Sequence, residues 1–239
     1  MEKLGDILKS RGGAGPGGLP LPKSLNKKPG GEDSAGTRRM SQEDQELQDL
    51  VVRASGLPLE TRASLRLSTL KLRRGVKGLR EALEGAQAVL SQELAWLTLQ
   101  GSCGLGKTHL AGAIGWEWLA QGRVCRYAQV SRLLERLRRT YDFTPEQAFE
   151  LRQPRFEEVF KWYADTPLLI LDDLGAEKLT DWAGSQLDAL VDHRYIRGLP
   201  LVVTTNVLLS ELPPRIASRL QDRRLGRVIT LSGPDYRTL

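Results

Sequence analysis

A phosphate-binding loop lies between an apolar stretch and a helical pattern, and this arrangement constrains the fold more than any other feature of the chain. Residues 101–108 are Gly-Ser-Cys-Gly-Leu-Gly-Lys-Thr, a complete G-x-x-x-x-G-K-T motif. The stretch 94–99 before it is mostly apolar, and Leu110, Ile114 and Trp118 follow at helical spacing. The motif needs this order of strand, loop and helix. We therefore expect an α/β fold in which the loop connects a strand to a helix.

The residues of this loop have distinct predicted tasks. Its glycines let the backbone curve so that N–H groups point at phosphate oxygens, and the N-terminus of the following helix adds a partial positive charge. Lys107 is predicted to bridge the β- and γ-phosphates of ATP, and the Thr108 hydroxyl to ligate Mg²⁺. The predicted nucleotide-binding residues are Gly101, Ser102, Cys103, Gly104, Leu105, Gly106, Lys107, Thr108 and His109.

Paired carboxylates follow a second apolar stretch. Residues 168–171 are Leu-Leu-Ile-Leu, and Asp172 and Asp173 come directly after them. A buried parallel strand delivers such residues to its carboxyl end, where open α/β sheets bind their ligands. We expect Asp172 to hold Mg²⁺, directly or through water, and Asp173 to polarise the attacking water. The alternative is a strand that a polar turn simply caps.

A third strand end and a downstream pair of arginines extend the candidate site. Asn206 follows the apolar stretch 201–205 and is predicted to orient water between the acids and the γ-phosphate; the alternative is an asparagine in a turn. Arg215 or Arg219 would reach the nucleotide of a neighbouring subunit and stabilise transition-state charge there. That role implies an ATP-dependent homo-oligomer. The alternative for either arginine is an ordinary surface salt link.

Strands and helices alternate along the rest of the chain. A helical stretch ends near Leu90, and further helices are expected at 107–121, 131–141, 155–164 and 180–197. Strands are expected at 94–99, 124–128, 168–171, 201–205 and 228–231. This alternation predicts a five-stranded parallel sheet between helices.

The N-terminal part of the chain differs from the rest in composition. Residues 1–40 are rich in glycine, proline and basic residues, which predicts a flexible basic tail. Residues 41–55 are expected to be a helical segment that binds a partner or acts as a linker, because Ser41 and Asp44 form the acidic variant of a capping box. Its apolar stripe would dock on the core or on a partner. The predicted ATPase domain is 56–239.

Composition excludes several other classes of protein. The chain has two cysteines, Cys103 and Cys125, and two histidines, without C-x-x-C spacing, which argues against a zinc site or a disulfide framework. It has no apolar run of membrane-spanning length and no signal-peptide core at its N-terminus, so we expect a cytoplasmic protein without a membrane partner. The formal net charge of +6 favours polyanionic partners.

These motifs together resemble the DnaC/DnaI-type AAA+ ATPases, which include replicative helicase loaders and the similar IstB transposition helpers. The segments that carry the resemblance are 101–111, 171–177, 193–195, 204–206, 218–220 and 235–237. The resemblance implies a compact AAA+ P-loop NTPase core with no C-terminal lid, because the chain stops soon after Arg237. It also implies that Asn206 is sensor 1 and that Arg219 is the better arginine-finger candidate, with Arg215 second.

By the same resemblance, the chain is expected to be an ATPase that loads a hexameric replicative helicase of the DnaB type onto single-stranded DNA. ATP hydrolysis would act as the switch, and residues 1–54 are placed to contact the helicase. Residues 131–142 correspond in position to a helical element that lines a DNA channel in initiator-type AAA+ proteins. The predicted DNA contacts there are Arg132, Arg136, Arg138, Arg139 and Tyr141, with Phe143 as a second aromatic candidate. A solvated helix face is the equal alternative.

Three other functions remain open at the level of the sequence. The nearest is an IstB-like ATPase helper of a DNA transposase, although such helpers usually begin with a folded helical domain rather than a Gly/Pro-rich tail. A small-molecule phosphotransferase on the same loop is a different class, and the Thr-Thr-Asn strand end at 204–206 and Arg219 argue against it. A nonenzymatic, nucleotide-gated DNA adaptor is the third, favoured if the short Asp173 side chain is unsuited to catalysis.

Overall fold

A computed structural model describes residues 41–69, 75–175 and 180–235 of the 239-residue chain. The predicted basic tail, residues 1–40, lies outside the described residues, as does the final motif residue Arg237. Among the described residues, every helix is too short or too polar to cross a lipid bilayer.

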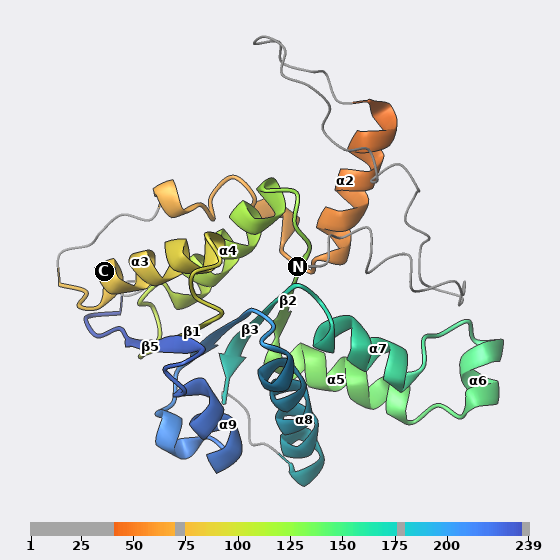
Figure 1. The fold of residues 1–239 in the computed structure, drawn as a ribbon. Coiled ribbons are helices and arrows are strands. Elements are labelled where there is room, and N and C mark those ends of the chain that lie inside the picture. Colours follow the sequence, from red (N-terminus) through yellow and green to blue (C-terminus); the bar gives the residue numbers. More distant parts are fainter. Residues whose placement is uncertain (1–40, 70–74, 176–179, 236–239) are drawn as a thin grey trace.

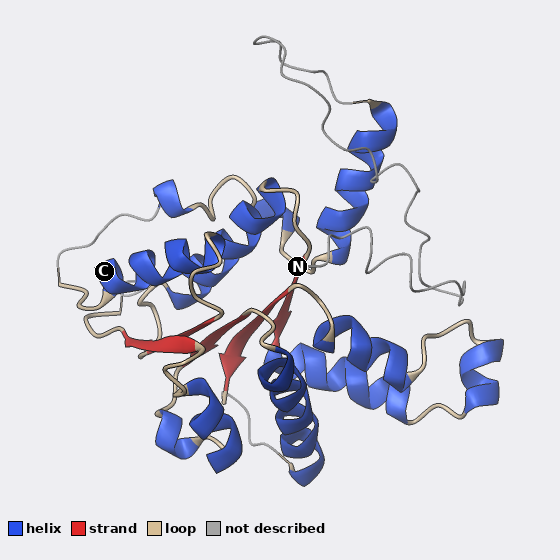
Figure 2. Cartoon of the chain, in the orientation of Figure 1, coloured by secondary structure: helices blue, strands red, loops and turns tan. Residues whose placement is uncertain are grey.

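Five parallel strands form the sheet, as the sequence predicts (Figures 1 and 2). They are β1 (Trp96–Gln100), β2 (Cys125–Gln129), β3 (Leu168–Leu174), β4 (Leu201–Thr205) and β5 (Gly226–Thr230). Their order is β2-β3-β4-β1-β5, and every neighbouring pair is parallel. Because β4 lies between β1 and β3, the phosphate-binding loop, the paired acids and Asn206 all follow neighbouring strands.

Helices cover both faces of the sheet. The helices are α2 (Gln42–Ala54), α3 (Leu79–Leu90), α4 (Lys107–Ala120), α5 (Val130–Tyr141), α6 (Pro145–Glu150), α7 (Phe156–Ala164), α8 (Asp181–Arg197) and α9 (Pro214–Leu220). Short 3₁₀ turns lie at Leu59–Thr61, Leu67–Thr69 and Leu209–Glu211. Figure 1 shows α3 and α4 on one face and α8 and α9 on the other.

Each face of the sheet has its own apolar core. Leu97, Ile170 and Val202 pack with α3 and α4, whereas Leu171 and Val203 pack with α5, α7, α8 and α9. Successive side chains of a strand point to opposite faces, so a strand buried on both faces needs a continuous apolar run. That requirement explains why the central strands lack the alternation of apolar and polar residues that is typical of an exposed sheet.

The C-terminal end of α2 is anchored on the sheet and its helices. Ser41 and Asp44 form the predicted capping box at its start. At its end, Val52 is buried in the same core as α3 and α4, and the Ser55 carbonyl oxygen accepts a hydrogen bond of 2.7 Å from the Tyr127 amide. Figure 1 shows α2 beside the β2 end of the sheet. The apolar stripe of α2 therefore packs partly against the same chain. The boundary between 41–55 and 56–239 stays a prediction.

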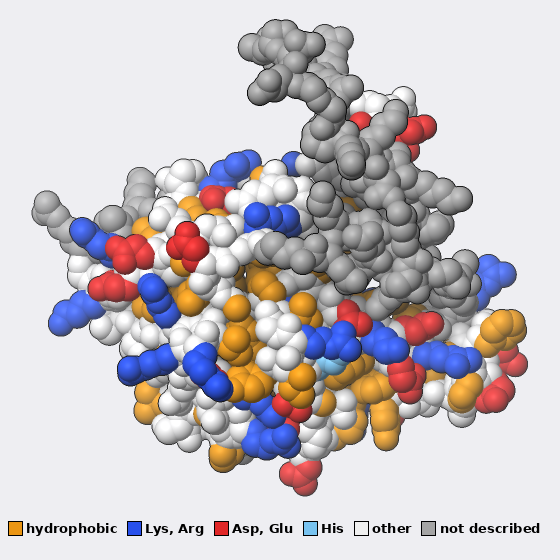
Figure 3. Space-filling model, viewed as in Figure 1, with side chains coloured by type: hydrophobic (Ala, Val, Ile, Leu, Met, Phe, Trp, Pro, Cys, Tyr) orange, Lys and Arg blue, Asp and Glu red, His pale blue; other side chains and the backbone are white. Residues whose placement is uncertain are grey.

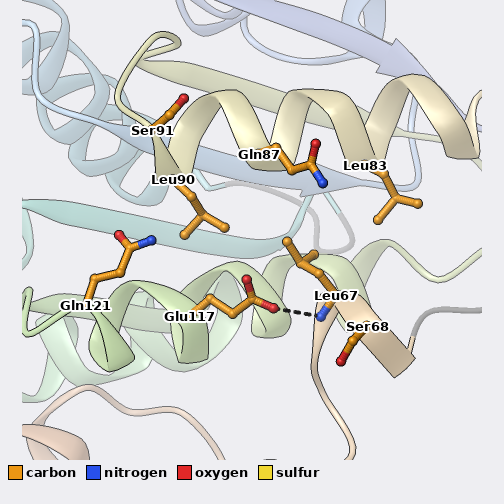
Figure 4. A pocket seen from close by; sticks show the side chains of 8 residues that line it. All are labelled: Leu67, Ser68, Leu83, Gln87, Leu90, Ser91, Glu117 and Gln121. Carbon is orange, nitrogen blue, oxygen red and sulfur yellow. Dashed lines mark hydrogen bonds between the residues drawn. The ribbon is translucent and has the colours of Figure 1, made fainter. Parts of the chain in front are cut away.

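A groove of about 590 Å³ lies between α3 and α4, on the face of the sheet opposite α8 (Figure 4). Leu83 and Leu90 come from α3, and the carboxylate of Glu117, from α4, accepts a hydrogen bond of 3.0 Å from the Leu67 amide. The Glu117 carboxylate thus holds the turn at Leu67–Thr69 against α4. The residues that line this groove include none of the predicted nucleotide-binding residues.

Candidate nucleotide-binding site

The phosphate-binding loop joins the end of β1 to the first residue of α4. Gly101, Gly104 and Gly106 have φ angles of +151°, +72° and +89°, which side chains with a Cβ rarely adopt. A Cβ on Gly101 would also lie 2.3 Å from the Leu231 carbonyl oxygen. Leu105 is buried against the α3–α4 core and fixes the middle of the loop. The glycines are therefore required by the backbone geometry of the loop itself.

The Lys107 side chain lies within the loop. It is buried, and its Nζ donates hydrogen bonds of 2.7 Å to the carbonyl oxygens of Gly101 and Ser102. Ser102 and Cys103 are exposed at the rim, and His109 is half-buried in the first turn of α4. An ammonium held inside a loop at a helix N-terminus creates positive potential where the phosphates of a nucleotide would bind.

Thr108 and Asp172 meet at the edge formed by the strand ends. Thr108 Oγ1 donates a hydrogen bond of 3.1 Å to Asp172 Oδ1. The Thr204 hydroxyl, at the end of β4, donates to the same oxygen at 2.5 Å. Asp172 is completely buried, and its other oxygen accepts a hydrogen bond of 2.6 Å from the Tyr127 hydroxyl. The structure thus brings together two residues that are 64 positions apart in the sequence, as the predicted magnesium site requires.

Asp173 and Asn206 lie next to this pair. Asp173 has a φ angle of +59°, at an irregularity in the pairing of β3 with β4 between Leu171 and Leu174. Its amide donates a hydrogen bond of 2.9 Å to Thr204 Oγ1, and Asn206 Nδ2 donates one of 3.2 Å to Asp173 Oδ1. Asp173 and Asn206 therefore lie next to each other. The Asp173 amide also contacts β4, the strand between β1 and β3.

The donor set fits Mg²⁺ with phosphate oxygens as additional ligands. Among the described residues, no cluster of three or more His, Cys, Asp or Glu side chains is arranged to hold a metal. Mg²⁺ in nucleotide sites is usually bound by one or two carboxylates together with phosphate oxygens and water. The Thr108 hydroxyl and the Asp172 carboxylate are hard oxygen donors of this kind.

The two arginine-finger candidates differ in exposure. The Arg219 side chain is 13% exposed, and its guanidinium pairs with Asp188 at 2.7 Å and with Asp192, both on α8. The Arg215 side chain is 69% exposed and pairs with Asp188 at 2.9 Å. To reach a neighbouring subunit, Arg219 would have to break its ion pairs with Asp188 and Asp192, whereas Arg215 would break only its ion pair with Asp188. Both assignments remain predictions.

The predicted DNA-binding helix carries its basic residues on its solvent face. Leu133 and Leu137 of α5 are buried in the core, whereas the four arginines are exposed: Arg132, Arg136, Arg138 and Arg139. Figure 3 shows a row of basic side chains over the region of α5 and α7, with acidic and hydrophobic side chains among them.

Local contacts already engage some of these residues. Arg139 pairs with Glu135, and the Arg136 guanidinium lies 5.4 Å from the centre of the Trp162 ring. Tyr141 is 59% exposed and makes edge-on contacts with the rings of Phe156 and Trp182. The exposed arginines and Tyr141 are thus accessible in this chain, and DNA binding by them remains a prediction.

Tyr127 is a site residue that the sequence reasoning missed. It lies in a strand predicted only for its apolar pattern, and its hydroxyl reaches the Asp172 carboxylate from β2. Burial, followed by the neighbouring Asp172 charge, raises the pKa of Tyr127 well above its ordinary value, so the hydroxyl stays protonated and donates. The sequence feature that could have indicated this contact is a tyrosine in the predicted strand 124–128.

Comparison with known proteins identifies the family of this chain. Residues 77–229 match the family described as IstB-like ATP binding protein. The chain is 31% identical over 168 residues to a putative ATP-binding protein in an insertion sequence of Mycobacterium tuberculosis, covering 65% of this chain and 63% of that protein. It is 29% identical over 117 residues to the replicative helicase loader DnaI of Bacillus subtilis, covering 48% of this chain and 34% of DnaI. The aligned region is thus less than two thirds of either relative.

Solved structures share the fold. The DnaC helicase loader matches with a TM-score of 0.59 and 22% identity over 72% of this chain and 99% of its own. DnaI matches with a TM-score of 0.57 and 25% identity over 74% of this chain and 93% of its own. AMPPCP-bound DnaA from Aquifex aeolicus has a TM-score of 0.60 at 19% identity, covering 74% of this chain and 51% of its own. The chain therefore belongs to the IstB-like ATP-binding protein family, a group of AAA+ P-loop ATPases whose fold is that of the DnaC and DnaI loaders.

Proposed function

We propose that this protein loads a replicative hexameric DNA helicase onto single-stranded DNA, with ATP hydrolysis as the switch. The observation that supports it most is the joined network of Thr108, Asp172, Thr204, Asp173 and Asn206. This network links the phosphate-binding loop to two adjacent strand ends, those of β3 and β4. The similarity to DnaI of Bacillus subtilis supports a loader, and the fold is shared with solved structures of DnaC and DnaI.

Each residue of the site has a task in this proposal. Lys107 and the loop amides bind the phosphates of ATP, and Thr108 with Asp172 hold Mg²⁺, which neutralises charge on the β- and γ-phosphates when bound. Asp173 accepts a proton from the attacking water, and the Asn206 amide orients that water. An arginine from a neighbouring subunit, Arg219 or Arg215, stabilises the transition-state charge.

The sheet offers a short route from the nucleotide to the DNA face. Gln129, the last residue of β2, pairs in register with Asp172. The arginine-bearing helix α5 starts at the next residue, Val130. A shift of Asp172 on nucleotide exchange would therefore act directly on the first turn of α5, and this is how ATP hydrolysis would change the grip on single-stranded DNA.

A helper of a DNA transposase is the second candidate. A specific observation favours it, since the family description and the 31% identical relative both point to insertion-sequence proteins. The same ATP site and the same DNA face would serve this function, and the difference lies in the partner protein.

Size-exclusion chromatography with light scattering tests the partner. The full chain is mixed with the replicative helicase of its host and ATP, and compared with a chain lacking residues 1–40, which keeps α2 and its buried Val52. Leu47→Glu on α2 is a second variant, and Lys107→Ala is the nucleotide control. We expect a stable complex with the full chain that the deletion or Leu47→Glu weakens. No complex in any nucleotide state, with a complex formed by a transposase instead, would favour the second candidate.

A further inference from the structure

Residues of two strands, β2 and β4, and Thr108 at the end of the phosphate-binding loop hold the Asp172 carboxylate of β3. Thr108 and Thr204 donate to Oδ1, at 3.1 Å and 2.5 Å, whereas Tyr127 donates to Oδ2 at 2.6 Å. The two oxygens thus have different environments. Oδ1 is turned toward the loop and the predicted magnesium ligand Thr108, and Oδ2 is turned toward the edge strand β2.

Burial makes this division of hydrogen bonds energetically important. Asp172 is 0% exposed, and a buried carboxylate oxygen without a hydrogen bond is strongly destabilised. Without a donor at Oδ2, the carboxylate would rotate to share the hydroxyl groups that now serve Oδ1. The Tyr127 hydroxyl therefore selects one orientation of the carboxylate.

The backbone of Tyr127 is held by a hydrogen bond and by the pairing of β2 with β3. Its amide donates to the Ser55 carbonyl oxygen at 2.7 Å, and it pairs in register with Ile170 of β3, two residues before Asp172. Gly56 has a φ angle of +74°, and a Cβ there would lie 2.6 Å from the Tyr127 carbonyl oxygen. The chain after α2 thus packs closely on β2 at Tyr127. This contact fixes the backbone position from which the Tyr127 ring extends.

We propose that Tyr127 is a positioning residue for the magnesium site, holding Asp172 Oδ2 so that Oδ1 faces Thr108. This inference rests on the proposed assignment of Mg²⁺ to Thr108 and Asp172. Partners that orient a metal ligand in this way typically contribute a factor of about 10 to 100 in metal affinity or activity.

A magnesium titration of Tyr127→Phe in the full chain tests the proposal. Binding of a fluorescent ATP analogue is measured at rising Mg²⁺ concentration and, separately, in EDTA. We expect the Mg²⁺ concentration for half-maximal enhancement of binding to rise about tenfold, and binding in EDTA to stay unchanged because the phosphate-binding loop is intact. Tyr163→Phe, on α7, removes a tyrosine hydroxyl that has no hydrogen bond to Asp172, and serves as the matched control.

Two results would overturn the inference. An unchanged magnesium midpoint would show that the hydroxyl does not act on the metal site, and an equal loss of binding in EDTA and in Mg²⁺ would show a merely structural role. Failure of the underlying assignment is distinguishable, because wild-type protein would then bind the analogue equally well with and without Mg²⁺.

Discussion

Lys107 makes hydrogen bonds within the phosphate-binding loop and is also the residue predicted to bind the phosphates of ATP. The two carbonyl oxygens that hold its ammonium belong to Gly101 and Ser102, the first residues of the loop. A nucleotide would compete with these carbonyl groups for the same ammonium, so the side chain is already placed at the phosphate position. Lys107 is buried, and these two hydrogen bonds satisfy part of the hydrogen-bonding capacity of its ammonium.

Removing this ammonium is expected to abolish nucleotide binding. For Lys107→Ala we predict a loss of ATP affinity of at least about 100-fold, because a charge-assisted contact with the phosphates is lost. Isothermal titration calorimetry measures the affinity, and circular dichroism confirms the fold. Tight ATP binding by this variant would contradict the site assignment.

Asp173 is expected to act in turnover and not in binding. For Asp173→Asn we predict near-normal ATP affinity and a fall in turnover of about 100-fold or more, because the amide cannot accept the proton of the attacking water. Asparagine also tolerates the φ angle of +59° at this position. Steady-state phosphate release at saturating ATP measures the effect, and unchanged turnover would place the base elsewhere.

Residue by residue, the sequence predicted the parts of the site that belong to contiguous motifs. The phosphate-binding loop, the acid pair and Asn206 could be identified because each follows an apolar strand. Tyr127 could not, since its contact with Asp172 depends on the register between β2 and β3, which no local pattern encodes. The ion pairs that hold Arg219 on α8 depend in the same way on how α9 packs.

Helix α8 is fastened to the sheet by a buried arginine. Arg194 is 0% exposed, and its guanidinium donates to the carbonyl oxygens of Tyr163, Ala164, Thr166, Pro167 and Pro200. These carbonyl groups lie at the end of α7 and just before β3 and β4. One side chain therefore joins a helix end to the starts of two neighbouring central strands.

Replacing this arginine is expected to destabilise the fold. For Arg194→Met we predict a loss of about 3 kcal/mol in the free energy of unfolding, because several buried carbonyl groups lose their donor. Arg197→Met is the matched control, since Arg197 is 60% exposed and pairs with Asp165 at 3.5 Å; we expect a change within about 0.5 kcal/mol. Urea denaturation measures both. Equal effects of the two substitutions would contradict the role of Arg194.

At the scale of elements, strong periodicity predicted most of the fold. The five strands and the longer helices lie within a few residues of their expected positions, because long apolar patterns define them. The short helices α6 and α9 were not predicted; each has a proline in its first turn, and α6 also has a Thr144–Gln147 capping box. The extension of β3 through Asp173 was also missed, because it depends on an irregular pairing with β4.

At the scale of the whole molecule, the end of β2 connects the candidate nucleotide site to the exposed arginines of α5. Asp172 pairs with Gln129, and α5 follows without an intervening loop. In the proposed function, a change at Asp172 acts through this pairing on the first turn of α5. The proposed function therefore requires that the bound nucleotide, ATP or ADP, control the affinity for single-stranded DNA.

The most direct test is fluorescence anisotropy of a labelled single-stranded oligonucleotide, with a nonhydrolysable ATP analogue or with ADP. We predict at least about tenfold tighter binding with the ATP analogue and a strong dependence on salt. Combined substitution of Arg132 and Arg136 by alanine should remove that difference, whereas Arg80→Ala on α3 should not. Equal affinity in the two nucleotide states, or binding that is indifferent to the α5 arginines, would contradict the account.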